Sequence, residues 1–186
     1  MTAMAIQALA PYYKTNETMK AAVDKALEVL SALQRNDGGF GSWGTVNSES
    51  CAQVIVALTA LGIDPTADSR FVKNGLTVLD ALAGFYVTGG GFRHTAGGDL
   101  DGMATEQGYY ALAAYYRFVN AQTRLYDMSD VTVQTAGTSG GDNSGNGTNN
   151  GGTPATGDTG VLVWIIALPV TILAAAFVLK RKEREA

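Results

Sequence analysis

Apolar residues recur at helical spacing between Glu17 and Leu33. The positions that set this spacing are Ala22, Leu27, Leu30 and Leu33. Residues three or four positions apart lie on one face of an α-helix, so the pattern predicts an amphipathic helix. Asn16 stands directly before this stretch, where its side chain can cap the first turn, and Gly38 follows its end. The pattern therefore predicts a helix over residues 17–33.

The same signals predict three further helices. They run from Ser48 to about Leu61, from Ser69 to about Phe85, and from about Met103 to Asn120. Ser48, Asp68 and Asp101 are the expected N-caps, because short polar side chains can accept the free N–H groups of a first turn. Runs of β-branched residues that alternate with polar ones are absent from the sequence. We therefore expect an all-α domain over residues 1–131.

The expected domain contains an internal repeat of roughly fifty residues. Three segments align on an Ala-Leu pair, and they start at Thr2, Cys51 and Thr105, with offsets of 49 and 54 residues. A glycine turn precedes the last two segments and ends at Phe40 and at Phe92, with an offset of 52 residues. Two glycines before an aromatic residue allow a sharp backbone turn that folds the ring back onto the helix ends. The shared turn and spacing favour a repeat architecture.

A membrane-spanning helix is expected near the end of the chain, over residues 160–180. Val161 to Leu179 are nineteen consecutive uncharged and mostly apolar residues. A helix of this length covers roughly 28 Å, close to the hydrocarbon thickness of a bilayer. The following residues 181–186 are rich in Lys and Arg, which places this tail in the cytoplasm and the preceding chain outside the cell. The sequence therefore predicts a single-pass protein whose C-terminus is inside.

Residues 132–159, which precede this helix, are expected to form a disordered linker, because they consist largely of Gly, Ser, Thr, Asn and Asp. The linker contains the string Thr153, Pro154, Ala155, Thr156 and Gly157. Together with the apolar helix and the basic tail, this order resembles the LPxTG-like sorting signal of Gram-positive surface proteins. The resemblance implies that a sortase cleaves after Thr156 and joins its carbonyl group to peptidoglycan. Thr153 replaces the usual Leu, and the alternative is a membrane protein that is never cleaved.

Charge and cysteine content exclude several functional classes. The formal net charge is −4, and residues 1–159 carry nine basic and fifteen acidic side chains. This balance argues against a nucleic-acid partner, because phosphate binding needs a basic face. Cys51 is the only cysteine, so an intrachain disulfide framework is excluded. The first ten residues lack the basic and strongly apolar regions of an export signal, so we expect the chain to be the C-terminal part of a longer protein.

The glycine turns, together with the spacing of Leu30, Gln34, Gly38 and Phe40, resemble the repeat of the terpenoid-cyclase and protein-prenyltransferase superfamily. That resemblance implies an α/α toroid, in which helical hairpins build an inner and an outer ring. By this analogy the helices at 17–33 and 69–85 are outer ones, and those that begin near Thr2, Ser48 and Met103 are inner ones. About two and a half hairpins are present, so the expectation is a partial toroid.

The resemblance also suggests catalytic residues that can be tested. Terpene cyclases use Asp-x-Asp-Asp, whereas this chain has Asp99 and Asp101 without the adjacent acid pair, and Asp101 is expected to be a helix cap. The prenyltransferases hold zinc with an acidic residue, a cysteine and a histidine, for which Glu49, Cys51 and His94 are weak candidates. Zinc needs three protein ligands that converge, so His94 qualifies only if its loop folds over the inner helix. No cofactor is therefore assigned, and an enzyme acting on a hydrophobic substrate stays the alternative.

The remaining polar and aromatic residues near the inner-helix starts form a candidate ligand rim. They are Trp43, Glu49, Gln53, Phe92, His94, Glu106, Gln107, Tyr109 and Tyr110. Aromatic rings supply contact area and amides or carboxylates fix orientation, so this mixture suits a small molecule or a glycan. The competing interpretation is that the aromatic residues only fill the core. The sequence thus favours a binding or adhesion module at the cell surface, with a spacer without ligand as a further alternative.

Overall fold

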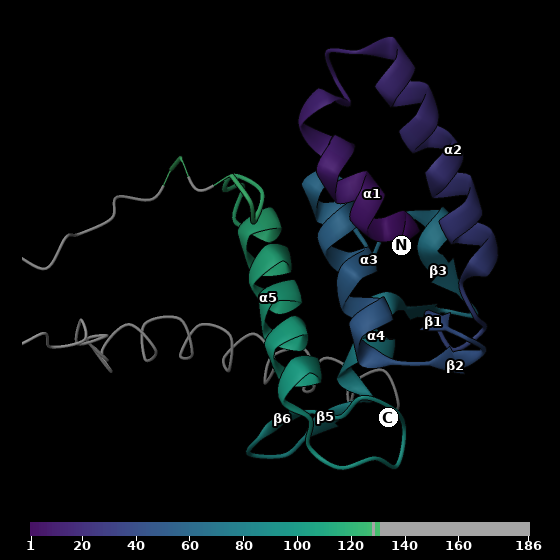
Figure 1. Ribbon diagram of the computed structural model, residues 1–186, viewed down its shortest axis with the longest axis vertical. Coiled ribbons are helices and arrows are strands. Elements are labelled where there is room, and N and C mark those ends of the chain that lie inside the picture. Colours follow the sequence, from purple (N-terminus) through teal and green to yellow (C-terminus); the bar gives the residue numbers. More distant parts are fainter. Residues whose placement is uncertain (128, 131–186) are drawn as a thin grey trace, which may run out of the picture. The chain divides into compact units, whose positions relative to one another are not determined.

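The computed structural model describes residues 1–127 and 129–130, and Figure 1 shows the arrangement of their elements. Within this part of the chain, no helix is both long and apolar enough to cross a membrane. The expected linker, the sorting motif at 153–157, the membrane helix at 160–180 and the basic tail lie outside the described residues.

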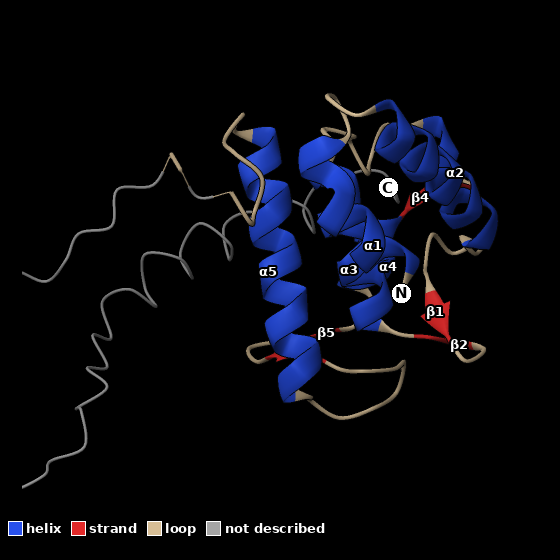
Figure 2. Cartoon of the chain, turned by 45° about the horizontal axis from the view of Figure 1, so that its top comes forward, coloured by secondary structure: helices blue, strands red, loops and turns tan. Residues whose placement is uncertain are grey.

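The described residues form five α-helices and two short 3₁₀ turns. The α-helices are α1 (Thr2–Leu9), α2 (Glu17–Leu33), α3 (Ser48–Ala60), α4 (Val78–Ala83) and α5 (Gly102–Val119), and the 3₁₀ turns are η1 (Ala10–Tyr12) and η2 (Ser69–Phe71). Helix α3 contacts α1, α4 and α5, and α2 contacts α1. Figures 1 and 2 show α3 between α5 on one side and α2 on the other. Helix α3 is therefore the centre of the domain.

Helix α2 is the element that the sequence predicts best, and its bounds Glu17–Leu33 confirm the expected ones. The Asn16 side chain accepts a hydrogen bond from the N–H of Met19 at 3.0 Å, which caps the first turn. Its buried face consists of Val23, Leu27 and Leu30. These residues are three or four positions apart, so burial of their side chains holds one face of the helix against the domain.

The prediction of a helix from Ser69 to Phe85 is wrong. Asp68 does act as a cap, but only for the single turn η2, where it accepts the N–H of Arg70. A turn at Asn74 and Gly75 follows, with φ of 52° and 77°, values that a right-handed helix cannot contain. Helix α4 then begins at Val78, because Thr77 and Asp80 cap each other's backbone in a capping box.

The strict all-α prediction also needs correction, because three small antiparallel β-hairpins join the helices. They are β1–β2 (Gly41–Ser42 with Thr45–Val46), β3–β4 (Val72–Lys73 with Leu76–Thr77) and β5–β6 (Tyr86–Val87 with Gly91–Phe92). Every strand has only two residues, too short for an alternating pattern to appear in the sequence. The first two hairpins close with two residues of positive φ, which matches the right-handed twist of paired strands.

The ends of α3 and α5 agree closely with the prediction, with one change of cap. Asn47 rather than Ser48 caps α3, because the Asn47 side chain accepts the N–H of Ser50 at 2.8 Å. Gly62 follows the end of α3 with a φ of 77°, as a terminating glycine does. Asp101 caps α5 as expected, accepting the N–H of Ala104 at 2.7 Å.

A buried arginine fastens the segment after α5 back onto the helix. Arg117 is almost fully buried, its Nε donates to the Thr123 carbonyl oxygen at 2.8 Å, and its guanidinium pairs with Asp130. The Thr123 hydroxyl also donates to Asp130, at 2.8 Å. These contacts satisfy a buried guanidinium, and removing its partner would leave a charge without compensation.

The carboxylate of Asp130 gives this contact a defined dependence on pH. Hydrogen bonds from Thr123 and then from Arg117 lower the pKa of Asp130 from its ordinary 3.8 to about 2. Because the pKa of Asp130 is lower in the folded than in the unfolded protein, its ionised carboxylate stabilises the fold at pH values above the unfolded pKa. This contribution to stability is lost as the pH falls toward about 2. We expect Asp130→Asn to lower the melting temperature at neutral pH, with the gap to wild type closing between about pH 4 and pH 2. A gap that stays constant over this range would contradict the assignment.

Candidate functional site

The two Gly-Gly-Phe turns contact the helices that follow them, α3 and α5, in the same way, which supports the predicted repeat. The N–H of Phe40 donates to the Cys51 sulfur at 3.4 Å, and the N–H of Phe92 donates to the Thr105 hydroxyl at 3.0 Å. Cys51 and Thr105 are the fourth residues of α3 and α5 and are the aligned residues of the sequence repeat. In each repeat, the side chain of the fourth helix residue thus holds the backbone of the phenylalanine that precedes the helix.

The next backbone contact repeats as well. The N–H of Asn47 donates to the Phe40 carbonyl oxygen at 3.2 Å, and the N–H of Asp101 donates to the Phe92 carbonyl oxygen at 2.9 Å. Asn47 and Asp101 are also the N-caps of α3 and α5. Each turn is therefore held by the cap residue and by the fourth residue of the helix that follows.

Cys51 takes part in this structural contact. Burial raises the pKa of its thiol to about 12. The described residues contain no group of three His, Cys, Asp or Glu side chains arranged to hold a metal ion. Of the three weak zinc candidates, the structure brings Glu49 and His94 together and leaves Cys51 apart from them.

The thiol of Cys51 should therefore be unreactive in the folded chain. At pH 8 we expect iodoacetamide to modify Cys51 much more slowly in the native protein than in urea, because burial restricts access and the raised pKa removes the thiolate. Mass spectrometry of samples quenched over time measures both rates. Equal rates in the native and denatured chain would show that the thiol is exposed.

A side-chain contact between Glu49 and His94 brings the loop after β6 to the start of α3. The Nδ1 atom of His94 lies 2.8 Å from both carboxylate oxygens of Glu49. The backbone reinforces the contact, since the N–H of Ser48 donates to the His94 carbonyl oxygen at 3.1 Å. The His94 side chain is 57% exposed and the Glu49 side chain 16%. The loop after β6 does fold over the start of α3, as the zinc hypothesis required, and it brings His94 to the carboxylate of Glu49.

Three glutamines link helices α1, α3 and α5. Gln7, Gln53 and Gln107 are each the sixth residue of α1, α3 and α5. The Gln7 amide donates to the side-chain oxygen of Gln53 at 2.8 Å, and the Gln53 amide donates to that of Gln107 at 3.1 Å. Figure 1 shows that α1, α3 and α5 run in the same direction. The three glutamines therefore lie at one level of three parallel helices.

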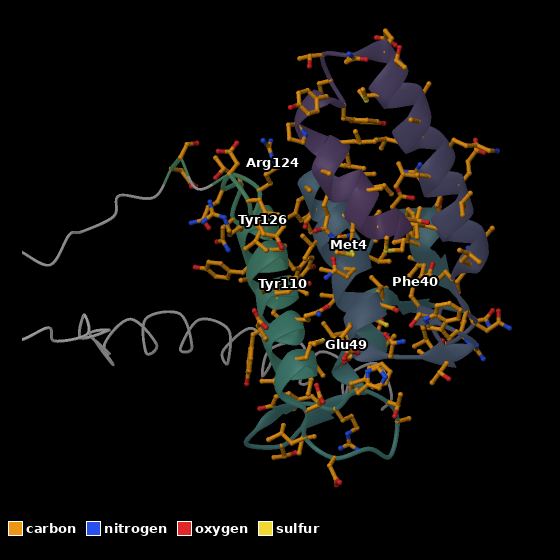
Figure 3. The ribbon with its side chains drawn as sticks, in the orientation of Figure 1. Met4, Phe40, Glu49, Tyr110, Arg124 and Tyr126 are labelled. Atoms are coloured by element: carbon orange, nitrogen blue, oxygen red, sulfur yellow. The ribbon has the colours of Figure 1, made fainter. Side chains whose placement is uncertain are left out.

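Tyr110 completes this amide chain on α5. Its hydroxyl accepts from the Gln53 amide and donates to Gln107 at 3.3 Å. Burial, and then the nearby acidic groups of Tyr126, Glu106 and Glu49, raise the pKa of Tyr110 to about 12, so the phenol is neutral at physiological pH. Figure 3 shows Tyr110 on α5 and Glu49 on α3, on the sides where these helices approach each other.

The remaining rim residues differ in their exposure. Phe92 is buried and Tyr109 is partly exposed, and their rings contact each other edge to face at 5.6 Å. The burial of Phe92 favours the competing interpretation that this residue fills the core. Trp43 and Glu106 are exposed, and Trp43 stands at the tip of the β1–β2 hairpin with a φ of 52°. Of the predicted rim, Phe92 is thus buried, Trp43 and Glu106 are exposed, and Tyr109 is partly exposed like the glutamines of α3 and α5.

Gln7 is the site residue that the sequence analysis missed. Gln7 lies in an Ala-rich segment. The repeat alignment of the sequence pairs Gln53 and Gln107 with Met4, which is three residues before Gln7, and so does not point to Gln7. Counting from the helix starts would have revealed it, because the three glutamines share the sixth position. Together Gln7, Glu49, Gln53, Gln107 and Tyr110 are called the polar strip below.

Comparisons with protein-family models, with curated proteins and with solved structures find no match for this chain. The chemistry of the polar strip therefore rests on its own geometry. It offers amide donors and acceptors, one neutral phenol and one carboxylate, all partly exposed. Such groups can hydrogen-bond a hydroxylated or amide-bearing ligand, and they provide no nucleophile activated by an adjacent base.

Proposed function

We propose that the described domain is a partial α/α toroid of about two and a half hairpins that serves as a binding or adhesion module. The parallel direction of α1, α3 and α5 supports their assignment as inner helices. Helix α2 contacts α1, and α4 contacts α3, as the outer members of such hairpins would. The repeated backbone contacts of Phe40 and Phe92 support the repeat that this architecture requires.

The proposed place of this module is the outer surface of a Gram-positive cell. Support comes from the order of the polar linker, the string Thr153 to Gly157, the apolar segment 160–180 and the basic tail. The proposed partners are a sortase that cleaves after Thr156, the peptidoglycan that receives the new carboxyl end, and the membrane before cleavage.

The polar strip is the observation that carries the binding proposal. Side-chain amides from three different helices, α1, α3 and α5, form hydrogen bonds with one another there. The strip is partly exposed, so its unused donors and acceptors can reach a ligand. The chemistry fits a small molecule or a glycan, with hydrogen bonds for orientation and the half-exposed Met4 for apolar contact. A zinc enzyme would need Cys51 in the site, whereas its thiol lies against Phe40.

A thermal-shift screen tests this proposal. Glycans, amphiphiles and corrinoids are added to the full chain, and binding of any of them to the folded state should raise its melting temperature. The gain should be lost in Gln53→Ala, which removes the central amide of the strip, and kept in Lys25→Ala, an exposed position on α2. A chain whose melting temperature responds to none of these compounds would be a spacer. A shift that Gln53→Ala leaves intact would place the ligand elsewhere.

A further inference from the structure

The β1–β2 and β3–β4 hairpins close with the same two-residue turn but with different residues in it. The turn residues are Trp43 and Gly44 in the first hairpin and Asn74 and Gly75 in the second. Their φ values are 52° and 84° in the first turn and 52° and 77° in the second, as in a type I′ turn. The two turns are therefore a matched pair within one chain, and they differ in Trp43 against Asn74.

Tryptophan is an unfavourable residue for the turn position that Trp43 occupies. Asparagine tolerates the left-handed region, and Asn-Gly is the pair that type I′ turns prefer, as in the β3–β4 hairpin. A bulky residue at positive φ is rare, because its Cβ atom crowds the backbone. The conformation of the turn therefore gives no reason for tryptophan at this position.

Packing gives no reason for tryptophan at this position either. The indole of Trp43 is fully exposed and touches no other side chain of the described residues. Figure 2 shows the tip of the β1–β2 hairpin extending away from the helices. The strands below the tip are held in place, because the side-chain amide of Asn47 donates to the Ser42 hydroxyl at 3.0 Å and to the Thr45 carbonyl oxygen at 3.2 Å. A fixed hairpin thus presents one large apolar ring to its surroundings.

We propose that Trp43 is a glycan-binding platform, on which the apolar face of one neutral sugar ring stacks. A pyranose ring carries C–H groups on its faces and hydroxyls at its edge, so it can cover an isolated indole without further apolar surface around it. Ser42 and Thr45 flank the turn and are exposed, and their hydroxyls can bond those of the sugar. This contact is separate from the polar strip, so either of the two can fail alone.

Size and charge favour a sugar over the other occupants of an exposed aromatic ring. A tryptophan side chain buries at most about 250 Å², whereas a stable protein interface buries about 800 Å² on each partner. An anionic membrane surface is disfavoured, because residues 1–159 carry nine basic and fifteen acidic side chains. Quaternary ammonium groups are held in cages of several rings, whereas Trp43 touches no other ring of the described residues.

Titration calorimetry of the full chain with neutral oligosaccharides tests this contact. The panel consists of hexasaccharides of glucose, N-acetylglucosamine, galactose and mannose, and at least one of them should bind. Trp43→Asn should weaken this binding about tenfold, and Trp43→Tyr should keep part of it because an aromatic ring remains. The melting temperature of Trp43→Asn should not fall, since asparagine suits the turn. Gln53→Ala should bind as the wild type does, which separates this contact from the polar strip.

Fluorescence shows whether the sugar lies on Trp43. The other tryptophan of the chain is Trp164, so Trp164→Phe leaves Trp43 as the only source of indole emission. A stacked sugar should shift this emission to shorter wavelength, because it removes water from the ring. A chain that binds no member of the panel, or binds equally well as Trp43→Asn, would overturn the proposal. An emission shift with phosphatidylcholine vesicles and with no sugar would also overturn it, because it would assign the ring to a membrane surface.

Discussion

Replacing Phe92 by alanine should lower the free energy of unfolding by about 3–5 kcal/mol, the usual cost of removing a buried aromatic side chain. The Phe92 ring is 2% exposed and stacks edge to face with Tyr86 at 5.4 Å as well as with Tyr109. The alanine variant leaves a cavity between β6 and α5 and removes both aromatic contacts. Urea denaturation of the two chains measures the difference.

Trp43 provides the matched control for Phe92, because it is an aromatic residue of the β1–β2 hairpin, which precedes α3 as the hairpin of Phe92 precedes α5. Its side chain is fully exposed, so Trp43→Ala should change the free energy of unfolding by no more than about 0.5 kcal/mol. A large loss in Trp43→Ala, or a small one in Phe92→Ala, would show that the aromatic core is misplaced.

The second large effect is expected at Gly108, where two influences oppose each other. Alanine is a better helix former than glycine by about 1 kcal/mol, so Gly108→Ala would stabilise an isolated α5. In the folded domain the new methyl group would overlap the buried Phe92 ring, which is covered on all sides and has little room to move. Overpacking typically costs about 1–3 kcal/mol, so we expect a net loss of stability.

Gly102 is the control for this substitution. It lies in the first turn of the same helix, and an added methyl group there meets nothing within 4 Å. Gly102→Ala should therefore be neutral or slightly stabilising. If Gly108→Ala also stabilises the protein, the ring of Phe92 does not lie against α5.

The helices that the sequence predicts well are those with local signals at both ends. Asn16 caps α2, and Asp101 caps α5, each through a side chain that can be identified without tertiary information. The helix predicted from Ser69 failed because apolar residues continue through a hairpin. The Asn74–Gly75 turn signal inside that stretch, with both residues at positive φ, was the local feature that outweighed the apolar spacing.

The sequence allowed us to predict which polar and aromatic residues are candidates for the site, but not which of them contact one another. Glu49 and His94 are 45 residues apart, and their contact depends on the path of the loop after β6, which no local pattern encodes. The role of Phe92 was ambiguous for a related reason, since an aromatic residue beside a glycine turn suits either a ligand or the core. Burial, which is a property of the assembled helices, assigned it to the core.

The register of the glutamines shows where sequence reasoning could have gone further. Helix starts at Thr2, Ser48 and Gly102 place Gln7, Gln53 and Gln107 at one depth, and two of these starts follow a capping residue visible in the sequence. The bonds between them depend on how the three helices pack side by side, which the repeat implies but does not establish.

Display at the cell surface is the central claim, and the most direct test is the chemical fate of Thr156. The chain is expressed behind an export signal in a Gram-positive host, and wall material released by a muramidase is analysed by mass spectrometry. We predict a peptide that ends at Thr156 and is joined to a peptidoglycan fragment, and Thr156→Ala should move the protein to the membrane fraction. Thr153→Leu restores the usual first residue and verifies that the host anchors such chains. Recovery of the unchanged chain with residues 157–186 intact, while Thr153→Leu is anchored, would contradict the claim.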